Sequence, residues 1–134
     1  MKTTADLVRG WITKADSDLA NARLCLAANV SLDTACFHTQ QAAEKLTKTY
    51  LMAHNLPVPF IHNLEKLLAL CEQHDASFSQ MKTLGQTLTP YAVQLRYDED
   101  FWPSIGEATA AIQAAEAFRA FIIPRIPLAM HPPP

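Results

Sequence analysis

The chain has 134 residues, of which 49% are hydrophobic and 18% charged, a composition typical of one globular domain and not of a disordered protein. The formal net charge of −2 provides no broad basic field, which argues against a dedicated nucleic-acid-binding protein. Three widely spaced cysteines and the lack of a long apolar run argue against a disulfide framework, a signal peptide and a membrane span, so a cytoplasmic location is expected.

Apolar residues recur at three- and four-residue spacing along the chain, which predicts helices and no strand. The first helix is expected over residues 4–28. Thr3 or Thr4 can cap its start, and Asn29 can adopt the left-handed conformation that ends a helix. Its expected buried face consists of Leu7, Trp11, Ala15, Leu19, Ala22 and Leu26.

The second helix is expected over residues 32–55, before the prolines at 57 and 59, because a proline disfavours helix in the residue before it. Its expected buried face consists of Cys36, Ala43, Leu46 and Tyr50, and Gln40 falls on the same face. A buried amide without a partner costs about 1–3 kcal/mol, so Gln40 must find one. Glu44 and Lys48 can pair one turn apart, worth about 0.2–0.5 kcal/mol, and their simplest interpretation is a solvated helix face.

Two further helices are expected over residues 63–75 and 78–96. Asn63 is a good cap for the former, whose apolar face consists of Leu64, Leu67, Leu68 and Cys71. In the latter, the apolar positions are Leu84, Leu88, Ala92 and Leu95. Pro90 must kink or restart this helix, because it lacks a backbone N–H, and Thr89 could cap a restart.

The fifth helix starts after Ser104, which forms a capping-box pattern with Glu107, and Pro124 ends it. Its expected buried face consists of Ile105, Ala108, Ile112, Ala115, Phe118 and Ile122. The fold class is therefore an all-α, antiparallel up-and-down bundle of about five helices over residues 1–123. Residues 124–134 form a proline-rich tail that is expected to be extended or disordered.

Besides the polar residues of the second helix, a second polar feature is the stretch 94–103, Gln-Leu-Arg-Tyr-Asp-Glu-Asp-Phe-Trp-Pro. Acids are unfavourable at a helix C-terminus, so the helix should stop near Arg96 or Tyr97 and leave the three acids in a loop. Arg96 could be a surface arginine held by one of these acids. Phe101 and Trp102 should either fold back onto the core or form a contact surface.

Metal and nucleophile motifs are weak. The sequence has no Glu-x-x-His motif of the kind that di-metal helical bundles use, and the spacing of Cys71 and His74 has no complementary pair, so no metal or other cofactor is expected. Cys36 and His38 point to different faces of their helix, which disfavours a catalytic thiol. No glycine-rich phosphate loop is present.

Four blocks together resemble the HEPN family of small helical domains, which are often encoded beside nucleotidyltransferases. The blocks are Trp11 with residues 14–22, residues 35–48, residues 61–68 and residues 88–97, in the order and approximate spacing of the family. The resemblance covers about residues 4–122. It implies an antiparallel helical bundle that is usually a homodimer.

The resemblance also implies a polar cleft. In such proteins the Q-x-x-E-K block lies near the arginine of the R-Y motif. The cleft would then be built from Gln40, Gln41, Glu44, Lys45, Arg96 and Tyr97. Within it, a supporting pair between Glu44 and Arg96 is expected.

One departure from the family bears on activity. HEPN ribonucleases carry an arginine followed by four to six residues and then a histidine, and here the corresponding positions hold Phe101, Trp102 and Pro103. A general acid or base is therefore missing where the chemistry needs one. The acids at 98–100 would also repel an RNA backbone.

The leading hypothesis is a non-catalytic, homodimeric interaction module that partners a separately encoded minimal nucleotidyltransferase, as in toxin–antitoxin pairs. One alternative is a metal-independent ribonuclease toxin that uses Arg96 and His62. Another is a nucleotide-binding module in which Arg96 and Lys45 hold phosphate, although the net charge gives nucleotide or RNA binding no support.

Overall fold

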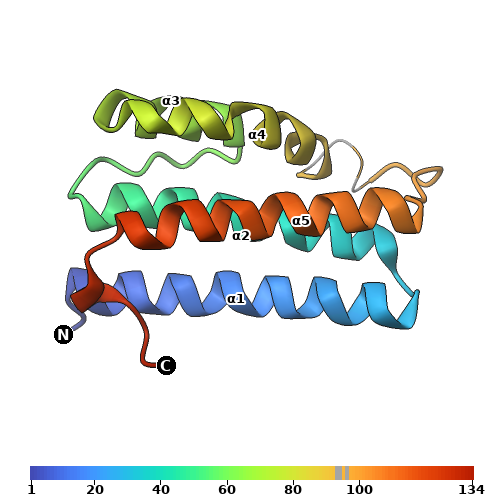
Figure 1. Ribbon diagram of the computed structural model, residues 1–134, viewed down its shortest axis with the longest axis horizontal. Coiled ribbons are helices and arrows are strands. Elements are labelled where there is room, and N and C mark those ends of the chain that lie inside the picture. The colour runs from blue at the N-terminus through green and yellow to red at the C-terminus, as the bar shows by residue number, and fades with distance from the viewer. Residues whose placement is uncertain (93–94, 96) are drawn as a thin grey trace.

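The computed structural model describes residues 1–92, 95 and 97–134 (Figure 1). Within these residues it is all-helical and has no strand, as expected. The α-helices are α1 (Thr4–Ala28), α2 (Leu32–Ala53), α3 (Leu64–His74), α4 (Lys82–Leu88) and α5 (Ile105–Ile122). Short 3-10 turns are η1 (Ala76–Met81), η2 (Thr89–Tyr91), η3 (Ile123–Arg125) and η4 (Leu128–Met130). None of the described helices is long and apolar enough to cross a membrane.

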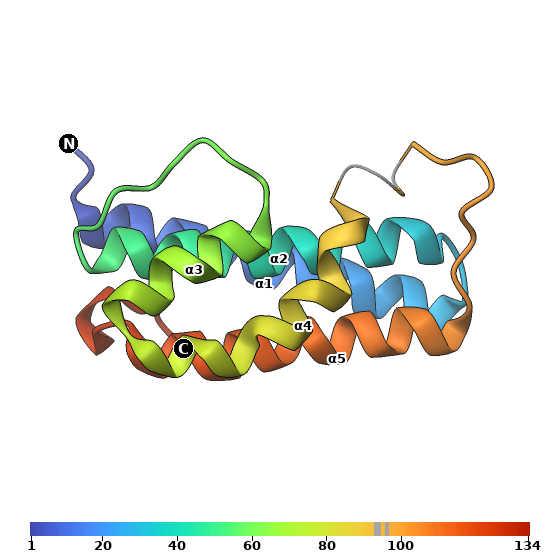
Figure 2. The same cartoon turned by 90° about the horizontal axis from the view of Figure 1, so that it is seen from above.

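The helices form a bundle around α2. α1 runs antiparallel to α2 and α5 packs beside both, while α3 and α4 cover the opposite side from α1 (Figures 1 and 2). Residues 54–63 run back along α2 before α3 begins, so α3 points the same way as α2 (Figure 2). Tyr50 near the end of α2 consequently meets His74 at the end of α3, with 2.6 Å between the Tyr50 hydroxyl and Nδ1. The connection between α2 and α3 is thus a long return and not a short turn.

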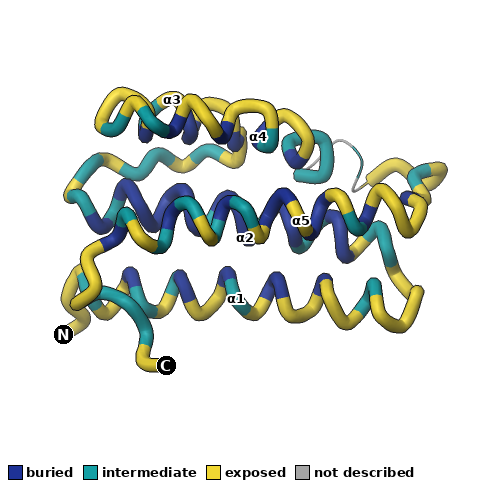
Figure 3. The backbone as a smooth tube through the Cα atoms, in the orientation of Figure 1, coloured by how far each residue is buried: buried dark blue, intermediate teal, exposed yellow. Residues whose placement is uncertain are grey.

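Helix α2 is the centre of the core, since it is buried around most of its circumference, whereas α1 buries one stripe (Figure 3). The buried faces expected for α2 and α3 are confirmed, Gln40 included, and so is the Asn63 cap. In α5 the capping box and the face from Ala108 to Ile122 are confirmed. Ile105 is the exception, because it lies in the first turn, outside the packed part of the helix, and is 51% exposed.

The expected buried face of α1 is wrong in its first half. Val8 and Ile12 are buried there, whereas Leu7 is 40% exposed and Trp11 is half-buried. The observed buried residues are spaced alternately by four and three residues, which keeps them on the side of α1 that faces α2. The expected residues Leu7, Trp11, Ala15 and Leu19 are spaced by four throughout, and such a series turns gradually around the helix and away from the contact. The left-handed Asn29 at the end of the helix is confirmed, and a capping box between Thr3 and Asp6 starts it.

The helix expected over residues 78–96, with a kink or restart at Pro90, is wrong in its first part, and its last part lies partly outside the described residues. The chain instead forms η1, the short helix α4 and then η2, in which Pro90 lies at the start. The break expected at Pro90 is confirmed, because α4 ends at Leu88. Thr89 does not cap a new helix: its backbone is helical and its hydroxyl donates to the Gly85 carbonyl at 2.8 Å. α4 also approaches α3 closely at Gly85, where a Cβ atom would lie 2.6 Å from Leu68 Cδ1.

The C-terminal tail is not extended or disordered as expected, because η3 and η4 fold it back onto the bundle. Ile126 is 2% exposed and belongs to the core. The Arg9 guanidinium donates to the Ala129 carbonyl at 2.7 Å, which ties the tail to α1. The prolines remove backbone donors from this segment but do not prevent its apolar side chains from being buried.

Candidate functional site

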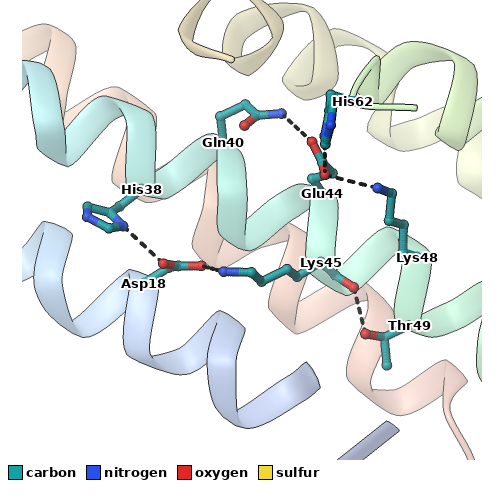
Figure 4. A network of polar contacts seen from close by, with 8 residues as sticks. All are labelled: Asp18, His38, Gln40, Glu44, Lys45, Lys48, Thr49 and His62. Carbon is teal, nitrogen blue, oxygen red and sulfur yellow. Dashed lines mark hydrogen bonds and ion pairs between the residues drawn. The ribbon is translucent and has the colours of Figure 1, made fainter. Parts of the chain in front are cut away.

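The Glu44 carboxylate in the middle of α2 is the centre of a polar cluster (Figure 4). Its Oε1 accepts from the Gln40 amide at 3.2 Å. Its Oε2 accepts from Lys48 Nζ at 3.1 Å and from His62 Nδ1, also at 3.1 Å. Because a carboxylate only accepts, the Nδ1 atom of His62 carries the proton. Gln40 has therefore found its partner on its own helix, one turn further on.

The pairing of Glu44 with Lys48 is confirmed, but its interpretation as a solvated helix face is wrong. Their side chains are only 12% and 10% exposed. Burial alone would raise the pKa of Glu44, yet hydrogen bonds from His62, Gln40 and Lys48 outweigh it and hold that pKa below its ordinary value. Among the described residues, every fully buried side-chain nitrogen and oxygen has a hydrogen-bond partner. The cluster thus keeps a charged carboxylate inside the bundle.

A groove of about 240 Å³ lies over this cluster. Its lining residues are Phe37, Gln40, Gln41, Glu44, His62, Ala92 and Tyr97. The structure therefore brings together four of the six residues predicted for a polar cleft. It adds His62, which sequence reasoning could not place. The returning connection before α3 carries His62 over α2, and no local pattern in the sequence predicts that path.

Lys45 does not join the groove, although it follows Glu44 directly. It points toward α1, where its Nζ lies 2.5 Å from Asp18 Oδ2 (Figure 4). The other oxygen of Asp18 accepts from His38 Nδ1 at 3.0 Å. Asp18 is 8% exposed and was missed by the sequence analysis, although its position between Ala15 and Ala22 on the buried face of α1 is a usable signal.

Arg96 lies outside the described residues, and so does its expected pairing with Glu44. Of the two aromatic residues that follow in the chain, Phe101 meets the expectation of folding back, whereas the contact surface expected of Trp102 stays a prediction. Phe101 folds back, with its ring centroid 5.7 Å from that of Tyr91, whereas Trp102 is 75% exposed. Pro103 is buried.

The two buried cysteines do not supply a nucleophile. Burial raises the pKa of Cys36 to about 11 and that of Cys71 to about 12. Both thiols are therefore protonated at neutral pH, and the thiolate is the reactive form. Among the described residues of the groove, the chemistry available is hydrogen bonding and, at His62, proton transfer.

Comparisons with known proteins place this arrangement in context. A family model described as the HEPN domain matches residues 8–126. The crystal structure of TT1696 from Thermus thermophilus is 26% identical, with a TM-score of 0.76 over 89% of this chain and 98% of that chain. ST0689, described as an archaeal HEPN homologue, is 22% identical, with a TM-score of 0.70 over 91% of this chain and 96% of that chain. A search of curated proteins found no match.

Proposed function

This chain belongs to the HEPN family, and we propose that it is a non-catalytic interaction module. In this proposal it forms a homodimer and pairs with a separately encoded minimal nucleotidyltransferase, as in two-gene toxin–antitoxin modules. Membership of the family supports a role within such a pair but does not by itself specify the partner or the activity.

One observation carries the proposal: the positions that hold the histidine of HEPN ribonucleases hold three apolar side chains here, of which Trp102 is exposed at the surface. Phe101 packs on Tyr91, Pro103 is buried and Trp102 is exposed. None of these side chains can accept or donate a proton in acid–base catalysis. Exposed aromatic side chains are enriched at protein interfaces, so the surface suits a partner better than a substrate.

Co-purification tests this proposal. The chain is co-expressed with the minimal nucleotidyltransferase of its own genome and measured by size-exclusion chromatography with light scattering. We expect a dimer alone and a complex with the nucleotidyltransferase, and Trp102→Ala should weaken the complex. Phe60→Ala is the matched control, because Phe60 is an aromatic residue that is even more exposed than Trp102 but lies on the connection between α2 and α3. A monomer that retains no nucleotidyltransferase would contradict the proposal, as would equal effects of the two variants.

A metal-independent ribonuclease is the second candidate, and the contact between Glu44 and His62 favours it. The carboxylate fixes the Nδ1 proton, so Nε2 of His62, whose side chain is 75% exposed, is left to accept a proton. This histidine lines the same groove as Tyr97. The arrangement resembles the carboxylate–histidine pairs that orient general bases in other enzymes.

An RNA-cleavage assay in a chelator separates the two candidates. The interaction module predicts no cleavage above background by the wild type. The ribonuclease predicts cleavage that His62→Ala and Glu44→Gln both abolish, while His131→Ala in the tail leaves it intact. Nucleotide binding through Lys45 receives no such support, because its amine is engaged by Asp18 on the side of α2 that faces α1.

A further inference from the structure

A second cavity of about 310 Å³ opens beside the groove, at the first two turns of α2. Its lining residues are Asp33, Thr34, Phe37, His38, Tyr91 and Phe101. Phe37 lines both spaces and so separates the cavity from the groove over Glu44. None of the other five residues belongs to that groove.

Aromatic rings form the walls of this cavity. The rings of Tyr91 and Phe101 lie 5.7 Å apart at an interplanar angle of 33°. The Tyr91 hydroxyl interacts with the buried Cys36 thiol. The electron-rich faces of such rings attract cations.

The polar groups in the cavity are mainly hydrogen-bond acceptors. Asp33 contributes a carboxylate, and Thr34 contributes a hydroxyl that can also accept. His38 donates its Nδ1 proton to Asp18, so its other ring nitrogen, which points away from Asp18 in Figure 4, accepts in the neutral ring. A ligand that supplies several donors would satisfy all three residues.

Among the described residues, the charge around this cavity is negative. No lysine or arginine is among the described residues that line the cavity. Asp98, Glu99 and Asp100 are exposed on the turn that leads directly into Phe101, whose amide donates to the Asp98 carbonyl at 3.1 Å. The N-terminus of α2 contributes only about half a positive charge, which Asp33 alone outweighs.

We propose that this cavity receives the guanidinium group of an arginine presented by a basic segment of the protein partner. A guanidinium is planar, stacks on aromatic faces and donates a forked pair of hydrogen bonds to a carboxylate, which matches the walls and Asp33. An ammonium group would satisfy the charge but not the flat, forked geometry. This inference rests on the proposed function, because it specifies the chemistry of the partner of the interaction module.

Calorimetry with a synthetic probe tests the cavity without the partner. The probe is an acetylated, amidated hexapeptide with one central arginine among glycines and serines, and its control carries citrulline, a neutral isostere of arginine. We expect the arginine peptide to bind at least 10-fold more tightly than the citrulline peptide. Asp33→Asn should weaken the arginine peptide at least 5-fold. Glu65→Gln, the same charge change on the exposed face of α3, should leave it unchanged.

Equal binding of the two peptides, or no binding of either at millimolar concentration, would overturn the proposal. Equal binding of free arginine amide would also overturn it, because the site would then be one for a small cation. Circular dichroism checks that Asp33→Asn is folded, and Phe101→Leu, which keeps an apolar side chain but removes a ring wall, provides an independent variant. If the nucleotidyltransferase forms no complex while the arginine peptide still binds, the proposed function fails and the cavity assignment stands.

Discussion

The Nδ1 atom of His62 lies 3.1 Å from Oε2 of Glu44, which joins the connection between α2 and α3 to the middle of α2. This contact fastens an exposed loop residue to a nearly buried carboxylate. The same carboxylate accepts hydrogen bonds from Gln40 and Lys48. The Glu44 side chain therefore binds two polar residues of its own helix and also holds the connection between α2 and α3 against that helix.

Glu44→Gln should destabilise the protein by about 3–5 kcal/mol, because it leaves the nearly buried Lys48 ammonium without its counter-charge. Urea unfolding followed by circular dichroism measures this loss. Glu116→Gln is the matched control: Glu116 pairs with Arg23 at 3.5 Å, but both side chains are almost half exposed, so less than about 1 kcal/mol should be lost. Losses of equal size would show that the cluster contributes no more than a surface pair.

Acidification should remove the stability that Glu44 provides. Its pKa in the folded protein is lowered from the ordinary value of 4.5, so the folded state favours the ionised form. The contribution is present above about pH 4.5 and is lost as the pH falls through the lower, folded-state pKa. Urea titrations from pH 7 to pH 3 should show the difference between the wild type and Glu44→Gln shrinking at the acid end. A constant difference would contradict this assignment.

Leu46→Ala should cost about 2–5 kcal/mol, since Leu46 is fully buried on α2 and its truncation opens a cavity in the core. Leu24→Ala changes the same atoms on α1 at a position that is 72% exposed, and should cost well under 1 kcal/mol. Both values come from urea unfolding at neutral pH. A loss below about 1 kcal/mol for Leu46→Ala would place the packed face of α2 elsewhere.

Two glycine substitutions should differ in effect. Gly10 lies inside α1 with nothing within 4 Å of an added Cβ, so Gly10→Ala should stabilise the protein by about 0.5–1 kcal/mol. Gly85→Ala brings the same propensity gain in α4, but its Cβ would meet Leu68 at 2.6 Å. We expect Gly85→Ala to be at least about 1 kcal/mol less stable than Gly10→Ala in thermal unfolding. Equal stabilisation would show that Leu68 moves aside freely.

Much of the fold follows from local patterns. Spacing of apolar residues predicts the helices and the buried faces of α2, α3 and α5, because which side chains share a helix face depends only on the helical repeat. Caps at Asn29, Asn63 and Ser104 are equally local, since each involves backbone groups within a few residues. The Glu44–Lys48 pair is local for the same reason.

Other features depend on packing between distant segments. The chain around Pro90 could equally have restarted as a helix, and only contacts with α2, α3 and α5 select the short α4 and the turn after it. Burial of Ile126 likewise holds the proline-rich tail against the bundle, although its composition predicts an extended or disordered segment. Composition describes which structures a segment can form alone, whereas burial against the rest of the chain decides between them.

The candidate site likewise depends partly on local sequence and partly on contacts between distant segments. The sequence determines that Gln40, Glu44 and Lys45 lie on one helix, but neighbouring side chains leave a helix about 100° apart, so Glu44 and Lys45 cannot face the same partners. The packing of distant segments decides which group each side chain contacts: Asp18 on α1 binds Lys45, and His62 above α2 binds Glu44. The sequence alone thus determined the helices and their polar residues. Only the packing of segments far apart in the chain decided which of those residues share a groove, because charge pairing in a bundle requires contact in space and not proximity in sequence.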